Sequence, residues 1–272
     1  MPHPERLVAL DVDGTLVDFD DQMSEAVRTQ VRRIAEIPGT HVVIATGRSL
    51  IGLLPVLDRL ELSDGYAICS NGAVTVRVSP HGRSGGEPGT PPYDIVEQVT
   101  FDAGPAVRLL REHLPDARFA VEVLGVGYRV HGSFPDGELN GLIEDVSFEE
   151  LTADPVGRVV VRSPSHTPEH FLELVARIGL HGVSYAVGWT AWLDLAPEGV
   201  TKASGLESGR RALGVQPDAT YAVGDGRNDM EMLQWAAHGA AMASAPPEVL
   251  ALADEVLPDV TEDGLVHLLR RL

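Results

Sequence analysis

Leu7-Val8-Ala9-Leu10-Asp11-Val12-Asp13-Gly14-Thr15-Leu16 is the stretch that decides the fold. Its first four residues are apolar, which is typical of a short strand buried on both faces in a parallel sheet. Two carboxylates follow directly, at the end of the strand where open α/β sheets bind their ligands. Asp11 and Asp13 would repel each other there unless a cation or a shared proton intervened. The pair is therefore a candidate metal and acid–base site, although an Asp-Gly turn would also explain it.

A strand–helix rhythm continues on both sides of a change in composition. Buried strands are expected at residues 41–45, 66–69, 191–195, 220–223 and 239–242, and helices at residues 24–37, 51–60, 201–213, 230–237 and 264–272. Pro55 falls near the first turn of the second of these helices. The alternation predicts an α/β fold with a doubly wound, mostly parallel, Rossmann-like sheet.

The middle of the chain has a different pattern. Residues 79–92 are rich in Gly and Pro, which excludes regular structure there. Expected strands at residues 119–123 and 128–131 partly alternate apolar and polar residues, as in an antiparallel sheet with one open face. Helices are expected at residues 106–113 and 168–178. We therefore expect an inserted α+β cap domain at residues 76–189, between two parts of a core domain at residues 1–75 and 190–272.

The composition disfavours several classes of protein. The chain of 272 residues has a net charge of −19, which repels nucleic acid and anionic lipid. No apolar run is long enough to span a membrane, and residues 1–6 lack a basic region leading into an apolar segment, so we expect no secretory signal. Cys69 is the only cysteine, which suits a reducing cytoplasm. The oligomeric state stays open.

Polar residues gather at the ends of the expected strands and at the start of one helix. Because the carboxyl ends of parallel strands meet at one edge of a sheet, residues far apart in sequence can converge there. The set combines carboxylates, a hydroxyl, an amide and an ammonium group: Asp11, Asp13, Thr46, Lys202, Asp225, Asn228 and Asp229. Oxygen ligands of this kind suit Mg²⁺, and positioning with charge neutralisation is what phosphoryl transfer requires.

Each member of this set also has an ordinary structural explanation. Thr46 before a glycine is a common helix cap, and the acidic turn at residues 225–229 can cap the helix that follows it. Lys202 alone would be a solvated lysine. Its place at a helix N-terminus is unfavourable for a cation, however, and a bound anion would relieve that cost.

Three other ligand-binding motifs do not match. A calcium loop needs Gly at its sixth position and Glu at its twelfth, whereas Gly14 is fourth and Gln22 twelfth when counted from Asp11. The dinucleotide fingerprint needs a small residue where Asp229 stands. Lys202 lacks the upstream glycine spacing of a P-loop.

Four ordered motifs resemble those of the haloacid dehalogenase-like (HAD) superfamily. They are Asp11-Val12-Asp13-Gly14-Thr15-Leu16, Thr46-Gly47-Arg48, Lys202 and Gly224-Asp225-Gly226-Arg227-Asn228-Asp229. Ser70-Asn71-Gly72-Ala73, together with an α+β insert between the second and third motifs, resembles the Cof-type, class IIB phosphatases of that superfamily. All four motifs in order are far more specific than any one of them.

The resemblance implies a Mg²⁺-dependent phosphatase acting on a small phosphorylated metabolite, such as a sugar phosphate or a phosphorylated cofactor. It implies that Asp11 is the nucleophile and Asp13 the general acid and base. The implied metal ligands are Asp11, Asp13 and Asp225, supported from the same loop by Asn228 and Asp229. The implied substrate-binding residues are Thr46, Gly47, Arg48, Asn71, Gly72, Lys202 and Asn228, of which Thr46 and Lys202 are also implied to be catalytic.

Two other functions remain open from the sequence. A phosphosugar mutase of the same superfamily passes the phosphoryl group back to a sugar, so it would release little free phosphate. A non-catalytic sensor of a phosphorylated metabolite would be expected to have lost Asp11, Asp13 or Lys202, and all three are present.

Overall fold

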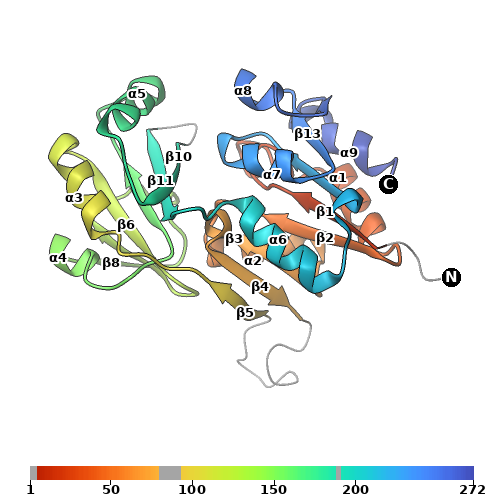
Figure 1. The fold of residues 1–272 in the computed structure, drawn as a ribbon, viewed down its shortest axis with the longest axis horizontal. Helices are drawn as coiled ribbons and strands as arrows, with labels where there is room; N and C mark the ends of the chain where they lie inside the picture. The colour runs from red at the N-terminus through yellow and green to blue at the C-terminus, as the bar shows by residue number, and fades with distance from the viewer. Residues whose placement is uncertain (1–4, 80–92, 188–190) are drawn as a thin grey trace.

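The computed structural model describes residues 5–79, 93–187 and 191–272 as two sheets with helices packed against them (Figure 1). The expected irregular stretch at residues 79–92 lies outside the described residues, except for Ser79. Within the three described ranges, no helix combines the length and the apolar character needed to cross a bilayer.

The first sheet has eight strands, with the motif strand near its centre. Their order is β14 (Glu255–Leu257), β13 (His238–Met242), β12 (Thr220–Gly224), β1 (Arg6–Leu10), β2 (Thr40–Ala45), β3 (Gly65–Cys69), β4 (Val74–Val78) and β5 (Tyr93–Gln98). β1 pairs in parallel with β2 and β12, so that Leu10 lies opposite Ile44 and Val223. The four apolar residues of β1 are fully buried, as their run predicts. Among the described residues, the antiparallel pairs of this sheet are β3–β4 and β4–β5, at one edge.

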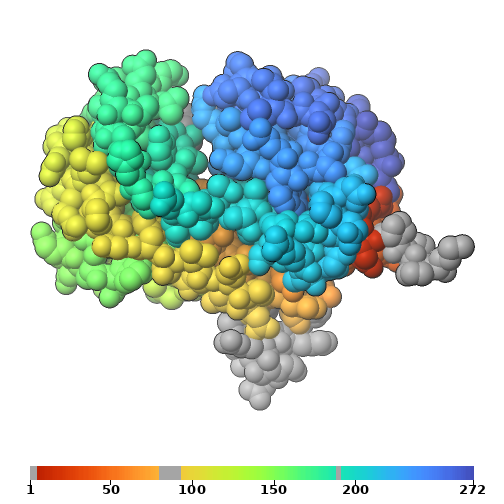
Figure 2. Space-filling model, in the orientation of Figure 1, coloured from red at the N-terminus to blue at the C-terminus, as the bar shows by residue number. Residues whose placement is uncertain are grey.

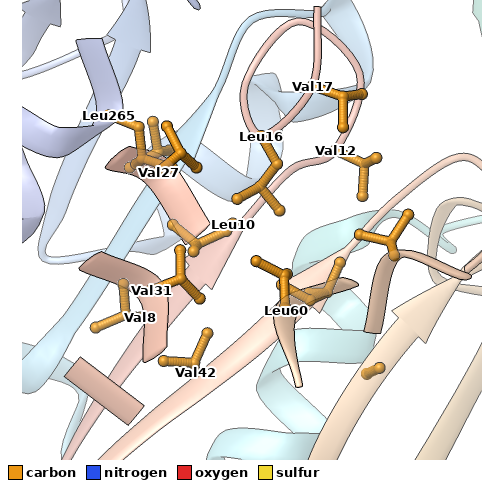
Figure 3. Close-up of a cluster of buried hydrophobic side chains, with 14 of the residues drawn as sticks. Val8, Leu10, Val12, Leu16, Val17, Val27, Val31, Val42, Leu60 and Leu265 are labelled. Atoms are coloured by element: carbon orange, nitrogen blue, oxygen red, sulfur yellow. The ribbon is translucent and has the colours of Figure 1, made fainter. Parts of the chain in front are cut away.

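Helices cover both faces of the first sheet. On one face, α1 (Glu25–Ala35), α2 (Leu50–Leu60) and α9 (Gly264–Leu269) enclose an apolar cluster, in which Val27 lies beside Leu265 and Val8 lies beside Val31 (Figure 3). On the other face, α6 (Lys202–Leu213), α7 (Met230–Trp235) and α8 (Pro247–Leu250) cover a second cluster, which includes Leu7 and Leu206. The expected doubly wound α/β fold is confirmed.

Local sequence explains where these helices begin and end. α1 starts after Ser24, whose hydroxyl accepts a hydrogen bond from the Val27 N–H. α6 starts after Thr201, which forms a capping box, and ends at Gly214, whose positive φ of 70° suits a residue without a side chain. Pro55 lies in the second turn of α2 rather than near its first, so one carbonyl of the first turn lacks an intrahelical donor.

The second sheet carries helices on one face only. Its strand order is β10 (Val183–Val187), β11 (Trp192–Pro197), β9 (Val159–Arg162), β6 (Arg118–Val123), β7 (Gly127–His131) and β8 (Leu142–Asp145). The helices α3 (Gly104–His113), α4 (Phe148–Leu151) and α5 (Pro168–Ile178) bury an apolar cluster that includes Val107, Phe119, Phe148 and Phe171. The sheet is antiparallel apart from the β7–β8 pair, as the alternating pattern predicts.

The chain passes from one sheet to the other at later residues than the expected domain boundaries at 75 and 190. β4 forms a hairpin with β3 and β5 pairs with β4, so residues up to 98 add to the first sheet. The expected strand at residues 191–195 is present as β11, but it pairs with β9 and β10 of the second sheet instead of returning to the first. The partners of a strand depend on long-range packing, which the local apolar pattern does not encode. We therefore place the inserted domain between β5 and the loop before α6.

Short 3₁₀ turns connect several of these elements: η1 (Ser70–Gly72), η3 (Pro217–Ala219), η4 (Arg227–Asp229) and η5 (Val260–Glu262). Two of them lie beside the strand ends that carry the motifs. η1 follows β3, and η4 follows β12 by two residues.

Candidate active site

The motif residues converge at the carboxyl ends of the parallel strands. Asp11 follows β1, Thr46 follows β2 and Asp225 follows β12, and these three strands are adjacent in the sheet. The Asp11 N–H donates to the Val223 carbonyl at 3.0 Å, which continues the β1–β12 ladder into the motif. Lys202, the first residue of α6, reaches the same place from the helix side. The convergence that the strand pattern predicts is therefore found.

Lys202 joins two of the carboxylates. Its Nζ atom lies 2.5 Å from Asp11 Oδ1 and 2.6 Å from Asp229 Oδ1, and its side chain is fully buried. Burial by itself would lower the pKa of the ammonium group, but the two carboxylates raise that pKa above its usual value. Lys202 is therefore a fixed positive charge next to Asp11.

One ammonium group does not neutralise the three acids around it. Oxygens of Asp11, Asp225 and Asp229 all lie within 4.8 Å of one another. Burial, and then repulsion from Asp229, raises the pKa of Asp11 to about 7. Burial, and then repulsion from Asp11, raises the pKa of Asp225 to about 9. Ionisation of all three acids would place excess negative charge in a dry place, and a further cation would relieve it.

Asp225 provides the atom that such a cation would need. Its Oδ2 is buried and has no hydrogen-bond partner among the residues that the structure describes. A buried carboxylate oxygen without a partner is costly. Gly14, with φ +79°, brings the motif loop so close that a Cβ there would lie 2.1 Å from this oxygen. The residues present therefore fit a divalent cation bound by oxygen ligands.

Asp229 organises the loop that carries Asp225. Its Oδ2 accepts hydrogen bonds from the backbone N–H groups of Asp225 and Gly226, at 3.0 and 2.9 Å. Its other oxygen binds Lys202. Asp229 therefore holds both Lys202 and the backbone of the loop that carries Asp225.

Asp13 points to Arg48 in this structure. The Arg48 guanidinium donates to both Asp13 oxygens and also to Asp21 Oδ1, which lies 2.7 Å from its Nη2. Asp21 is bound in turn by Arg59. Asp13 is more than half exposed, unlike the buried Asp11. Arg48, expected to contact substrate, is thus first of all the partner of Asp13.

The turn Ser70–Gly72 connects the remaining motif residues. Thr46 is fully buried, its hydroxyl accepts from the Arg48 N–H at 3.0 Å, and its carbonyl accepts from the Asn71 N–H at 3.1 Å. The Asn71 side-chain oxygen accepts from Asn228 Nδ2 at 3.0 Å. Gly72 lies so close to the start of α6 that a Cβ would approach the Thr201 carbonyl oxygen to 2.0 Å.

A cavity of about 570 Å³ lies between the two sheets, above this cluster. Figure 2 shows the surface notched where the green and blue parts of the chain meet. The first-sheet side of the cavity includes Asp11, Asp13, Gly47, Arg48, Asp225 and Asn228. Asn71 and Lys202 line a second, adjoining cavity of about 440 Å³, which shares Asn228 and Asp194 with the first. A ligand in the larger cavity would therefore contact both sheets.

Sequence reasoning missed the residues on the second-sheet side of the cavity. Arg158 is buried and donates to Asp194 Oδ1 at 2.9 Å and to the Tyr128 hydroxyl at 3.0 Å. Trp192 Nε1 lies 3.3 Å from the same Asp194 oxygen. The one signal available was Asp194 itself, an acid inside the apolar run at residues 191–196. Asp21 carried no comparable signal.

Comparison with known proteins agrees with this geometry. The family model described as haloacid dehalogenase-like hydrolase matches residues 8–83 and 140–269. The 5-amino-6-(5-phospho-D-ribitylamino)uracil phosphatase of Bacillus subtilis is 26% identical over 269 residues, covering 97% of this chain and 96% of that protein.

Two solved structures share the whole fold. A Bacteroides thetaiotaomicron protein, described among phosphatases of the haloalkanoate enzyme superfamily, is 25% identical with a TM-score of 0.76, covering 98% of this chain and 95% of that one. A sugar phosphatase of HAD subclass IIB has 24% identity and a TM-score of 0.77, with 98% of each chain covered. The family model matches well over half of the chain, and the chain therefore belongs to the haloacid dehalogenase-like hydrolases.

Proposed function

We propose that this protein is a Mg²⁺-dependent phosphatase that hydrolyses small organic phosphomonoesters through an aspartyl phosphate on Asp11. The observation that carries the proposal is the buried Asp11 carboxylate, bonded to Lys202 beside the unpartnered Asp225 oxygen. A nucleophile, a fixed positive charge and a carboxylate oxygen able to bind a metal are groups that phosphoryl transfer needs.

Asp11 attacks the phosphorus atom in the first step. A bond forms between an Asp11 carboxylate oxygen and phosphorus while the ester P–O bond breaks, and Asp13 donates a proton to the departing alcohol oxygen. In the second step Asp13 accepts a proton from water as the water oxygen attacks the same phosphorus. The Asp11–phosphorus bond then breaks, and inorganic phosphate is released.

The groups proposed to bind the transferring phosphoryl group come from Lys202, which contacts Asp11, and from the strand end of β2. Lys202, through its Nζ, and Thr46, through its hydroxyl, are proposed to bind the phosphoryl oxygens. Mg²⁺ would be held by the carboxylates of Asp11 and Asp225 and the backbone carbonyl of Asp13, and it would supply further neutralisation of phosphate charge. A small positive pocket within a chain of net charge −19 would thereby accept an anion.

The cavity between the sheets supports a small substrate. Its volume of about 570 Å³ falls within the range of pockets that enclose small molecules. The substrate is proposed to be a sugar phosphate or a phosphorylated cofactor, in keeping with the B. subtilis relative, whose name gives a phosphorylated ribityl compound. Gly47, Arg48, Asn71, Gly72 and Asn228 are proposed to contact it from the first-sheet side.

A phosphate-release screen tests the proposal. The chain is incubated with a panel of sugar phosphates, phosphorylated cofactors and p-nitrophenyl phosphate, each with Mg²⁺ and with a chelator. Free phosphate that appears only with Mg²⁺ and is lost in Asp11→Asn supports a phosphatase. Phosphate that stays on a sugar bisphosphate would indicate a mutase instead, and binding without turnover in any assay would indicate a sensor.

A further inference from the structure

The Glu122 side chain, from the second sheet, contacts residues beside the first sheet. It lies on β6, yet its carboxylate accepts hydrogen bonds from two groups of the core: the Ser70 hydroxyl at 2.5 Å and the Leu50 N–H at 3.3 Å. Ser70 is fully buried, and Leu50 is the first residue of α2. A carboxylate at that position satisfies a free N–H at the positive end of the helix.

The turn that Glu122 contacts is strained. Ser70 and Asn71 have φ values of +51° and +54°, and Gly72 follows with +102°. Residues other than glycine rarely adopt positive φ values, so surrounding contacts must hold the turn in place. The Ser70 N–H donates to the Arg48 carbonyl at 2.8 Å, and the Asn71 N–H donates to the Thr46 carbonyl. Whatever holds Ser70 therefore also holds the loop that carries Thr46.

Further contacts cross between the sheets at the same place. Asn71 Nδ2 lies 3.3 Å from Asp194 Oδ2 on β11, and the Tyr128 hydroxyl of β7 bonds to Ser49. Two carboxylates of the second sheet, Glu122 and Asp194, thus hold consecutive residues of one core turn. These bonds exist only while the second sheet lies over the first as it does here.

We propose that Glu122 is a positioning residue that couples the placement of the inserted domain to the turn Ser70–Gly72. With the second sheet in place, its carboxylate completes the hydrogen bonds of Ser70 and of the first turn of α2. The turn then holds Thr46 through the Asn71 N–H, and Asn228 through the Asn71 side chain. Glu122 contacts no reacting atom in this scheme, and its kinetic consequence rests on the proposed phosphatase function.

Amide exchange tests the contact without any assay of activity. In Glu122→Ala, peptides covering residues 49–52 and 70–73 should exchange about tenfold faster than in the wild type, because a charge-assisted acceptor is lost. Peptides from β9 should be unchanged, which shows that the second sheet stays folded. Glu122→Gln keeps an acceptor oxygen and should restore most of the protection. Unchanged exchange of both core peptides in Glu122→Ala would overturn the proposal.

A double-mutant cycle tests the coupling to turnover. Glu122→Ala and Ser70→Ala should each lower kcat for p-nitrophenyl phosphate about tenfold, with less effect on KM, and the double variant should be no slower than either alone. Glu144→Ala, an exposed glutamate of β8 in the same sheet, is the matched control and should retain wild-type kinetics. Multiplying effects, or wild-type kcat in Glu122→Ala, would overturn the coupling.

The two proposals fail in different ways. If the wild type releases no phosphate but Glu122→Ala loosens the core peptides, the phosphatase function is refuted and the structural contact stands. If the wild type is active, Asp11→Asn is inactive and Glu122→Ala matches the wild type in both measurements, the function stands and the positioning role is refuted.

Discussion

Arg48 donates three hydrogen bonds to the carboxylate of Asp13: Nη2 lies 2.6 Å from Oδ1, and Nε lies 3.2 Å from Oδ1 and 3.0 Å from Oδ2. The side-by-side geometry fixes the plane of the carboxylate, as guanidinium–carboxylate pairs do. Arg48 is itself held by Asp21, which Arg59 binds from the other side. An otherwise exposed acid is thereby kept in one orientation next to Asp11.

Replacing Arg48 should therefore slow turnover by an amount that depends on the leaving group of the substrate. Arg48→Met should lower kcat/KM for an alkyl phosphate such as glycerol phosphate by about tenfold or more, because an alkoxide needs a well-placed proton donor. p-Nitrophenyl phosphate should lose far less, since its leaving group departs without protonation. Steady-state kinetics on both substrates measure the difference. Arg271→Met is the control, because this arginine pairs with Glu255 and lies outside the Asp13 network. Equal losses on both substrates would instead assign Arg48 to binding.

Asp11→Asn should abolish turnover and leave the fold intact. The amide cannot form the phosphoryl intermediate, so phosphate release should fall by more than about a thousandfold. Because burial raises the pKa of Asp11 to about 7, a neutral side chain of the same shape should not reduce thermal stability in the absence of metal. Phosphate release and a thermal melt measure the two effects. Substantial Mg²⁺-dependent activity in this variant would exclude Asp11 as the nucleophile.

Asp225→Asn should weaken metal activation. The Asp225 Oδ2 atom has no hydrogen-bond partner, so its replacement by an amide removes a candidate ligand without breaking a bond to that atom. We expect the Mg²⁺ concentration that gives half-maximal activity to rise about tenfold or more. Titration with Mg²⁺ at saturating substrate measures this shift. An unchanged titration curve would count against Asp225 as a ligand.

Without divalent cations, stability should fall as pH rises. In the folded state the pKa of Asp11 is raised from 3.8 to about 7 and that of Asp225 from 3.8 to about 9. Between the unfolded and the folded pKa values, the folded protein therefore binds more protons than the unfolded chain. Their contribution is therefore present below about pH 4 and is lost progressively up to about pH 9. Urea unfolding in the presence of chelator, at about pH 5, 7 and 9, measures this change in the free energy of unfolding. In Asp225→Asn the decline should end nearer pH 7, and a rise in stability across this range would contradict the argument.

Lys202→Met should be strongly destabilising in the metal-free protein. Lys202 is fully buried between Asp11 and Asp229, and removing it leaves buried carboxylates without their cation. Breaking such a buried pair costs about 3 kcal/mol or more. Chemical denaturation in chelator measures the loss. Combining Lys202→Met with Asp11→Asn should recover part of the lost stability, because one unpaired buried charge is then absent. A double variant less stable than Lys202→Met alone would contradict the pairing.

Much of the fold could be predicted because local residue patterns encode it. The apolar run before Asp11 predicts a buried central strand, and the residues of that strand are fully buried in the structure. Gly214 predicts the end of a helix, and α6 ends there in a left-handed conformation. The assignment of the strand at residues 191–195 to the first sheet was wrong, because an apolar strand has the same local pattern in either sheet. Only its long-range partners, β9 and β10, decide where it lies.

The sequence by itself determined which chemical groups the site would contain and which end of the sheet would gather them. Asp11 and Thr46 stand directly after predicted strands and Asp225 one residue beyond another, and parallel strands bring their carboxyl ends to one edge. Only the tertiary structure decided how these groups are held. The turn of Asp13 toward Arg48 and the reach of Glu122 to Ser70 depend on side-chain torsions and on contacts between residues far apart in the chain, which no local pattern specifies.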